Sequence, residues 1–278
     1  MQTSFEPFVK AKGLTKRYPS FALEDVSFSV EAASITGFIG RNGAGKSTTL
    51  KCLEGAVRPD EGEVFYFGMP FPGNEDIAKQ QIGFELGSAT FFRTKRVSDI
   101  ASVTRRFYKL WDDRAFDKYC DRFAIDQHKR IKELSQGMCV KFTLALALSH
   151  HSRLLILDEP TSGLDPASRD EVCDIFLTLA RDEGVGILFS THITSDLDKC
   201  ADHIIYIENG RIKGAGEREA FKAAYRVVSL EEAKAMHARI LGIRRSVSGD
   251  TALVPSEARI GEAATLDDIM THTQKEVQ

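Results

Sequence analysis

The stretch Gly40-Arg41-Asn42-Gly43-Ala44-Gly45-Lys46-Ser47 matches the pattern G-x-x-x-x-G-K-[ST]. Residues 34–39 before it are mostly apolar and β-branched and predict a buried strand, whereas residues 48–54 after it contain few helix breakers and predict a helix. A strand, a glycine-rich loop and a helix N-terminus form the context in which this motif binds phosphate. The glycines let several backbone N–H groups point at one anion, and the helix dipole adds positive potential there. The stretch therefore predicts a nucleotide site, in which Lys46 reaches the outer phosphates and the Ser47 hydroxyl ligates Mg²⁺.

A second element of that site follows the unbroken apolar run of residues 154–157, which is typical of a central parallel strand buried on both faces. The run ends in Asp158 and Glu159, at the carboxyl end of the strand, where open α/β sheets place their ligands. We expect the Asp158 carboxylate to hold Mg²⁺, directly or through water, opposite Ser47. The neighbouring Glu159 is placed to accept a proton from the attacking water.

Two further segments carry groups that suit phosphate. His192 ends the next predicted strand, residues 186–190, and a parallel pairing of the two strands brings its imidazole beside the γ-phosphate. Ser135, Gln136 and Gly137 precede a segment of strong helix formers, so a hydroxyl and free N–H groups face an anion there as well. Either both helix starts surround one nucleotide, or the second faces a nucleotide on another copy of the chain.

The composition narrows the function classes. The chain has 278 residues, 42% of them hydrophobic, and a net charge of −3, which gives no sign of the basic face of a nucleic-acid-binding protein. No apolar run approaches the roughly 18 residues of a membrane span, and the N-terminus lacks the pattern of a signal peptide. The five cysteines are scattered, which favours reduced thiols. We therefore expect a cytoplasmic protein whose membrane role requires a separate partner chain.

The remaining patterns predict an α/β fold with additions. Residues 9–18 and 22–30 alternate as antiparallel strands, and residues 97–108, 113–123 and 136–149 repeat apolar residues at helical spacing. The aromatic residues of this helical part are expected to form its core: Phe107, Tyr108, Trp111, Phe116, Tyr119 and Phe123.

The boundaries follow these shifts in pattern. We expect a nucleotide-binding core with a mixed RecA-like sheet and an antiparallel β subdomain at residues 8–86 and 150–218, a helical subdomain at 87–149, and a small α+β appendage at 219–278. Packing of the appendage on its own core or on a partner subunit is the preferred interpretation, and a regulatory or self-dimerising role is the alternative.

Taken in order, these motifs resemble the nucleotide-binding subunit of an ABC transporter, over about residues 8 to 218. Residues 134–138 (Leu-Ser-Gln-Gly-Met), residues 145–150 and residues 190–196 are similar to ATPase subunits of bacterial ABC-2-type exporters. The resemblance implies a P-loop NTPase fold, ATP and Mg²⁺ as ligands, and a homodimer or a pair with a related ATPase subunit. It also implies a separate integral-membrane permease, a peripheral location on the inner face of the cell membrane, and no nucleic-acid partner.

The resemblance also implies a role for each motif residue. Tyr18 would stack on adenine, and the loop from Gly40 to Thr48 would cradle the phosphates. Ser47 and Asp158 would serve Mg²⁺, Glu159 would be the catalytic base and His192 the γ-phosphate sensor. The signature residues Ser135, Gln136 and Gly137 would close over ATP held by the opposite subunit. Asp165 would link the two sites across the interface.

The chain departs from the family pattern at three places. Gly87 stands where relatives usually carry a glutamine, or in some exporters an acidic residue, that contacts Mg²⁺, and Glu85, two positions away, is the alternative candidate for that contact. Gln136 and Met138 replace the commoner Gly and Gln of the signature, and Cys139 stands where a basic residue is frequent. Two alternative functions stay open, of which only the second is suggested by a departure, that at Gly87. One is a non-transport ABC ATPase that acts on nucleic acid or ribosomes, and the other is a subunit that binds ATP but hydrolyses it weakly.

Overall fold

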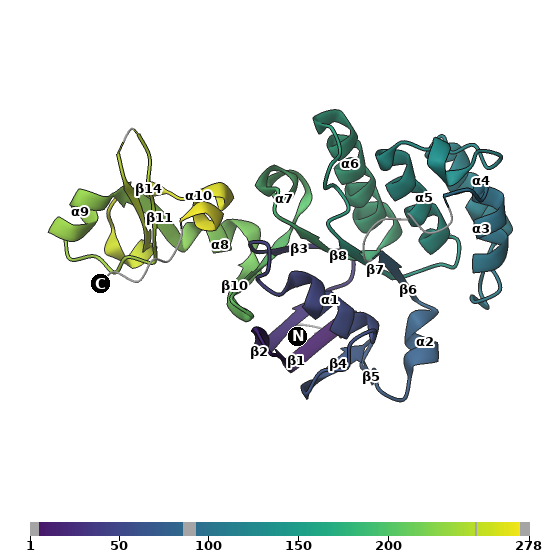
Figure 1. Cartoon of the computed structure of the whole chain (residues 1–278), viewed down its shortest axis with the longest axis horizontal. Helices are drawn as coiled ribbons and strands as arrows, with labels where there is room; N and C mark the ends of the chain where they lie inside the picture. The colour runs from purple at the N-terminus through teal and green to yellow at the C-terminus, as the bar shows by residue number, and fades with distance from the viewer. Residues whose placement is uncertain (1–5, 86–92, 248, 273–278) are drawn as a thin grey trace. The chain divides into compact units, whose positions relative to one another are not determined.

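The computed structural model describes residues 6–85, 93–247 and 249–272. The chain divides into two compact units, Met1–Lys213 and Gly214–Gln278, and Figure 1 shows the helices and strands of each. Among the described residues, no helix has both the length and the apolar character needed to cross a membrane.

The first unit is built on a six-stranded sheet of order β10-β9-β3-β8-β7-β6. β3 pairs in parallel with β8 and β9, and β7 pairs in parallel with β8 and β6. This mixed order places the end of β7 beside the end of β8, as predicted. The strands are β3 (Ile35–Ile39), β6 (Ile82–Glu85), β7 (Leu154–Asp158), β8 (Gly186–Thr191), β9 (His203–Glu208) and β10 (Arg211–Glu217).

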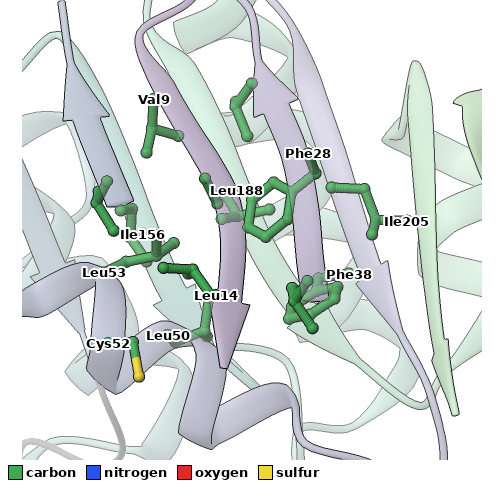
Figure 2. Packing of buried hydrophobic residues seen from close by; sticks show 14 of the residues in the cluster. Val9, Leu14, Phe28, Phe38, Leu50, Cys52, Leu53, Ile156, Leu188 and Ile205 are labelled. Carbon is green, nitrogen blue, oxygen red and sulfur yellow. The ribbon is translucent and has the colours of Figure 1, made fainter. Parts of the chain in front are cut away.

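A second, four-stranded sheet of order β2-β1-β4-β5 is antiparallel, which confirms the prediction from residues 9–30. Helix α1 (Lys46–Glu54) lies between the two sheets (Figure 1). Its Leu50 and Leu53 join side chains from both sheets in one fully enclosed core, in which Leu14, Phe38 and Leu188 are all 0% exposed (Figure 2). The α1 N-terminus is thereby fixed at the end of β3. The strands of this sheet are β1 (Val9–Tyr18), β2 (Phe21–Val30), β4 (Glu61–Tyr66) and β5 (Met69–Pro70).

The middle of the chain is helical, as expected, with one correction. The helix predicted over residues 97–108 ends at Thr104, and Phe107 is 70% exposed rather than part of a core. Phe116, Tyr119 and Phe123 are buried as predicted, and Tyr108 and Trp111 are half-buried. The helices here are α2 (Glu75–Lys79), α3 (Val97–Thr104), α4 (Asp113–Arg122), α5 (Gln136–Leu148) and the short 3-10 turn η1 (Ile131–Glu133).

Helices α6 (Pro166–Glu183) and α7 (Thr194–Cys200) pack against the parallel strands. The Phe176 ring of α6 lies 5.5 Å from that of Phe189 in β8, centroid to centroid. Sequence patterns did not predict α7, because it is short and gains stability from tertiary contacts rather than from propensity. The Leu197 side chain of α7 packs directly against Gly37 of β3. A Cβ atom at residue 37 would lie only 2.1 Å from that leucine side chain.

The second unit is a small α+β body with a four-stranded sheet of order β12-β13-β11-β14. Helix α9 (Leu230–Ala235) is shorter than the predicted segment to residue 240, because His237 adopts a left-handed backbone conformation, φ 51°, that no helix continues. The other elements are α8 (Arg218–Ala223), β11 (Tyr225–Ser229), β12 (Gly242–Arg244), β13 (Thr251–Pro255), the 3-10 turn η2 (Ser256–Ala258), β14 (Glu262–Ala263) and α10 (Leu266–Thr271).

Candidate functional site

A cavity of about 580 Å³ lies over the start of α1. It collects side chains and backbone from four separate parts of the first unit, and many of them are residues that the sequence predicted. The lining residues are Ser20, Phe21, Arg41, Asn42, Gly43, Gly45, Lys46, Ser47, Thr48, Glu159, Ser162 and His192. The volume and the polar lining suit a nucleotide phosphate chain.

The shape of the phosphate loop depends on glycines at two points. Gly45 is the N-cap of α1 with φ 115°, a conformation that L residues rarely adopt, and a Cβ there would lie 2.6 Å from Leu23 of β2. At Gly40, a Cβ would lie 2.4 Å from the carbonyl oxygen of Ile207 in β9. Both glycines therefore let the loop turn tightly against the antiparallel and parallel sheets, so that free N–H groups of the α1 start face the cavity.

Lys46 is folded back into this loop and is only 6% exposed. Its Nζ donates to the carbonyl oxygen of Gly40 at 2.7 Å and lies 3.4 Å from Oε1 of Glu159. The loop and the end of β7 are therefore joined by a positive charge that faces the cavity. To bind this ammonium group, an anionic phosphate has to compete with the Glu159 carboxylate and with backbone carbonyl oxygens of the loop.

Glu159 lies at the centre of the site. Its backbone has φ 53°, a left-handed conformation that is uncommon for a residue with a side chain. The Oε2 atom lies 2.7 Å from Nδ1 of His192, while Oε1 faces Lys46. The carboxylate is thus held between an imidazole and an ammonium group, and it lines the cavity with both of them. In this arrangement one carboxylate oxygen can accept a proton from water while the histidine fixes the other.

Ser190, a residue that the sequence analysis did not select, orients this centre. Its Oγ donates to Oδ1 of Asp158 at 2.5 Å and accepts from the backbone N–H of Glu159 at 2.9 Å. Because Asp158 pairs with Ser190 across β7 and β8, the hydroxyl is buried between the two strands. Its position two residues before His192, on the neighbouring parallel strand, was the signal available in the sequence.

The donor set at this edge fits Mg²⁺. Ser47 lines the cavity, and Asp158 ends β7 with one carboxylate oxygen accepting from Ser190. Hydroxyl and carboxylate oxygens are the ligands that Mg²⁺ prefers, and Mg²⁺ keeps several waters when few protein ligands are present. Asp158 itself is not part of the cavity lining.

Several predicted residues lie outside the cavity lining: Tyr18, Gly40, Ala44, Ser135, Gln136, Gly137, Asp158 and Asp165. Tyr18 is 42% exposed at the end of β1, with Nζ of Lys16 5.9 Å from its ring centroid, whereas Ser20 and Phe21 line the cavity. The signature residues and Asp165 begin two other helices. Ser135 caps α5 by accepting from the N–H of Met138, and Asp165 caps α6 by accepting from those of Ala167 and Ser168. Hydrogen bonds from Ser168 lower the pKa of Asp165.

Of the two residues expected to complete the metal side, Gly87 lies outside the described residues. Glu85 is the last residue of β6. Burial raises the pKa of Glu85 above its ordinary value, and the nearby Thr143 hydroxyl partly offsets the rise. The carboxylate is not part of the cavity lining.

Comparison with known proteins shows which family the chain resembles. The family model described as ABC transporter matches residues 23–162. The bacitracin transport ATP-binding protein BcrA of Bacillus licheniformis is 31% identical over 207 residues, which are 73% of this chain and 68% of that protein. The Nod factor export ATP-binding protein I of Neorhizobium galegae is 34% identical over 200 residues, 70% of this chain and 57% of that protein.

A solved structure of an ATP-binding subunit of an ABC transporter superimposes with a TM-score of 0.69 at 25% identity, covering 77% of this chain and 92% of that one. A dimeric bacterial ABC transporter cassette has a TM-score of 0.67 at 19% identity, covering 75% and 98%, and supports the P-loop NTPase fold. The phosphate loop, the paired end of β7 and β8 and these matches together show that the chain belongs to the ABC transporter family, as an ATP-binding subunit with ATPase activity.

Proposed function

We propose that the chain dimerises around ATP and that its ATP hydrolysis drives export through a separate membrane permease, as an ABC-2-type exporter subunit. The observation that supports hydrolysis best is the placement of the Glu159 carboxylate between Lys46 and His192 in the cavity wall. Names of relatives point to transport and, in one case, to export. The proposed location is the inner face of the cell membrane, reached through the permease.

The mechanism assigns each step to a residue of the chain. Backbone N–H groups of the loop and the Lys46 ammonium group bind the phosphates of ATP. Oε1 of Glu159 takes a proton from the water that attacks the γ-phosphorus. The bond from that phosphorus to the oxygen shared with the β-phosphate breaks, and ADP and inorganic phosphate leave. His192 holds the carboxylate in position through Nδ1. Mg²⁺, held by Ser47 and Asp158, would neutralise phosphate charge when it is bound.

Because Ser135 and Gly137 lie outside the cavity of their own subunit, we propose that they close over ATP bound to a second copy. Asp165 would then lie near the contact between the copies. ATP stabilises such a dimer by mass action, and its hydrolysis removes that stabilisation. Adenine stacking on Tyr18 belongs to the same proposal, and Phe21 in the cavity lining is a second aromatic available to the base.

The test is ATP-dependent dimerisation of the Glu159→Gln variant, followed by sedimentation velocity with ATP and Mg²⁺. We expect a stable dimer, because the amide retains the shape of the carboxylate but accepts no proton. The matched control is Glu159→Gln combined with Lys46→Ala, which we expect to stay monomeric at the same ATP concentration. A Glu159→Gln protein that binds ATP and remains a monomer would refute the dimer proposal.

The alternative, an ABC ATPase that acts on nucleic acid or ribosomes, predicts a different partner. Affinity purification of the tagged chain from detergent-solubilised cells separates the two. Recovery of a polytopic membrane protein supports the exporter proposal, and recovery of ribosomes or nucleic acid in its place supports the alternative.

A further inference from the structure

The Gln136 side chain connects the signature segment to the turn that follows Glu159 within one subunit. Nε2 of Gln136, the first residue of α5, donates to the carbonyl oxygen of Ser162 at 2.8 Å. The amide lies against Gly163, where a Cβ would be 2.9 Å from Nε2. Gly163 has φ 75°, so both its conformation and its neighbour favour glycine. Gln136 is thus directed into its own subunit.

Ser162 is linked directly to Glu159 from its other side. The N–H of Ser162 donates to the carbonyl oxygen of Glu159 at 3.1 Å, and Ser162 itself lines the cavity. Ser162 therefore accepts a hydrogen bond from Gln136 at its carbonyl oxygen and donates one to the Glu159 backbone from its N–H group. Two hydrogen bonds thus link the start of α5 to the backbone of the proposed base across this short turn.

The start of α6 lies close to both of these segments. A Cβ at Gly137 of α5 would lie 3.6 Å from Ser168 of α6 and 3.9 Å from Leu164, which is ordinary contact distance. Ser168 in turn donates through Oγ to Asp165 at 2.6 Å. Helices α5 and α6 also lie side by side in Figure 1. The start of α5, the turn at residues 159–164 and the start of α6 thus lie close to one another.

We infer that Gln136 is a positioning residue that couples the two nucleotide sites of the dimer. This rests on the proposed function, in which Ser135 and Gly137 close over ATP on the second copy. Closure there moves the start of α5, and Gln136 passes the movement to Ser162 and so to Glu159 at the subunit's own ATP. The second copy does the same in return, so hydrolysis at the two sites is cooperative.

The test is the variant Gln136→Met, which keeps the length and neutrality of the side chain and removes the donor. ATP turnover is measured against ATP concentration for the full chain. We expect kcat to fall about fivefold, the effect of one hydrogen bond of ordinary strength, and the Hill coefficient to fall from above one toward one. The matched control is Gln127→Met, because Gln127 is also hydrogen-bonded, to Asp117 at 2.8 Å, but lies outside the cavity lining.

A second measurement separates coupling from nucleotide binding. Gln136→Met is combined with Glu159→Gln, and ATP-dependent dimerisation is compared with that of Glu159→Gln alone. We expect dimerisation constants that agree within about twofold, because the lost bond lies within one subunit.

Four outcomes overturn the inference: unchanged kcat and Hill coefficient in Gln136→Met, a wild-type chain without cooperativity, an equal loss in Gln127→Met, or dimerisation weakened as much as kcat. Failure of Glu159→Gln itself to dimerise refutes the proposed function instead, so the two failures are distinguishable.

Discussion

Removal of the Ser190 hydroxyl tests whether this buried group holds the hydrolytic centre together. In Ser190→Ala, Oδ1 of Asp158 loses its 2.5 Å donor, and the N–H of Glu159 retains the backbone carbonyl oxygen of Ser190 at 3.1 Å. The main loss is one hydrogen bond to a charged group. We expect the free energy of unfolding to fall by about 2 kcal/mol and ATP turnover to fall about tenfold, because the carboxylate is no longer fixed.

The assay is urea unfolding followed by circular dichroism, together with steady-state ATP turnover. Ser149→Ala is the matched control, because Ser149 is equally buried but its Oγ donates only to the carbonyl oxygen of Ala145. That carbonyl still accepts from the N–H of residue 149, so the control should lose less than about 1 kcal/mol. If Ser190→Ala is no less stable than the control and turns over ATP normally, the bridging role of Ser190 is refuted.

Two predictions concern pH. Burial lowers the pKa of His150, stacked on Tyr108, from 6.5 to about 4, so the unfolded chain binds more protons between these values and stability is lost as pH falls. Between about pH 7.5 and pH 5, the free energy of unfolding should fall by about 2 kcal/mol more in the wild type than in His150→Gln, as measured by urea unfolding. The control is His128→Gln, at an exposed histidine, which should behave like the wild type. An equal fall in the wild type and in His150→Gln contradicts this prediction. The raised pKa of Glu85 has the opposite sign, because the folded state favours the protonated acid. Glu85→Gln should therefore stabilise the chain at about pH 7.5 by a margin that shrinks toward pH 4, and a constant margin in the same urea titrations refutes this.

The sequence alone was enough to predict the elements that depend on neighbouring residues in the chain. The loop of residues 40–47, the apolar run before Asp158 and the alternating strands are written in residue type and spacing, and the structure has them where they were predicted. The pairing of the strands that end in Asp158 and His192 was also predictable, because the carboxyl ends of adjacent parallel strands meet at one edge of a sheet.

Only the tertiary structure decided the contacts made between distant segments. Ser190 was an ordinary strand residue until β7 and β8 placed its hydroxyl on Asp158, and Gln136 was a signature variant until the fold brought Ser162 to it. The short helix α7 and the exposure of Phe107 likewise depend on packing rather than on local propensity. Such hydrogen bonds join residues 26 and 32 positions apart, a separation that no local pattern records.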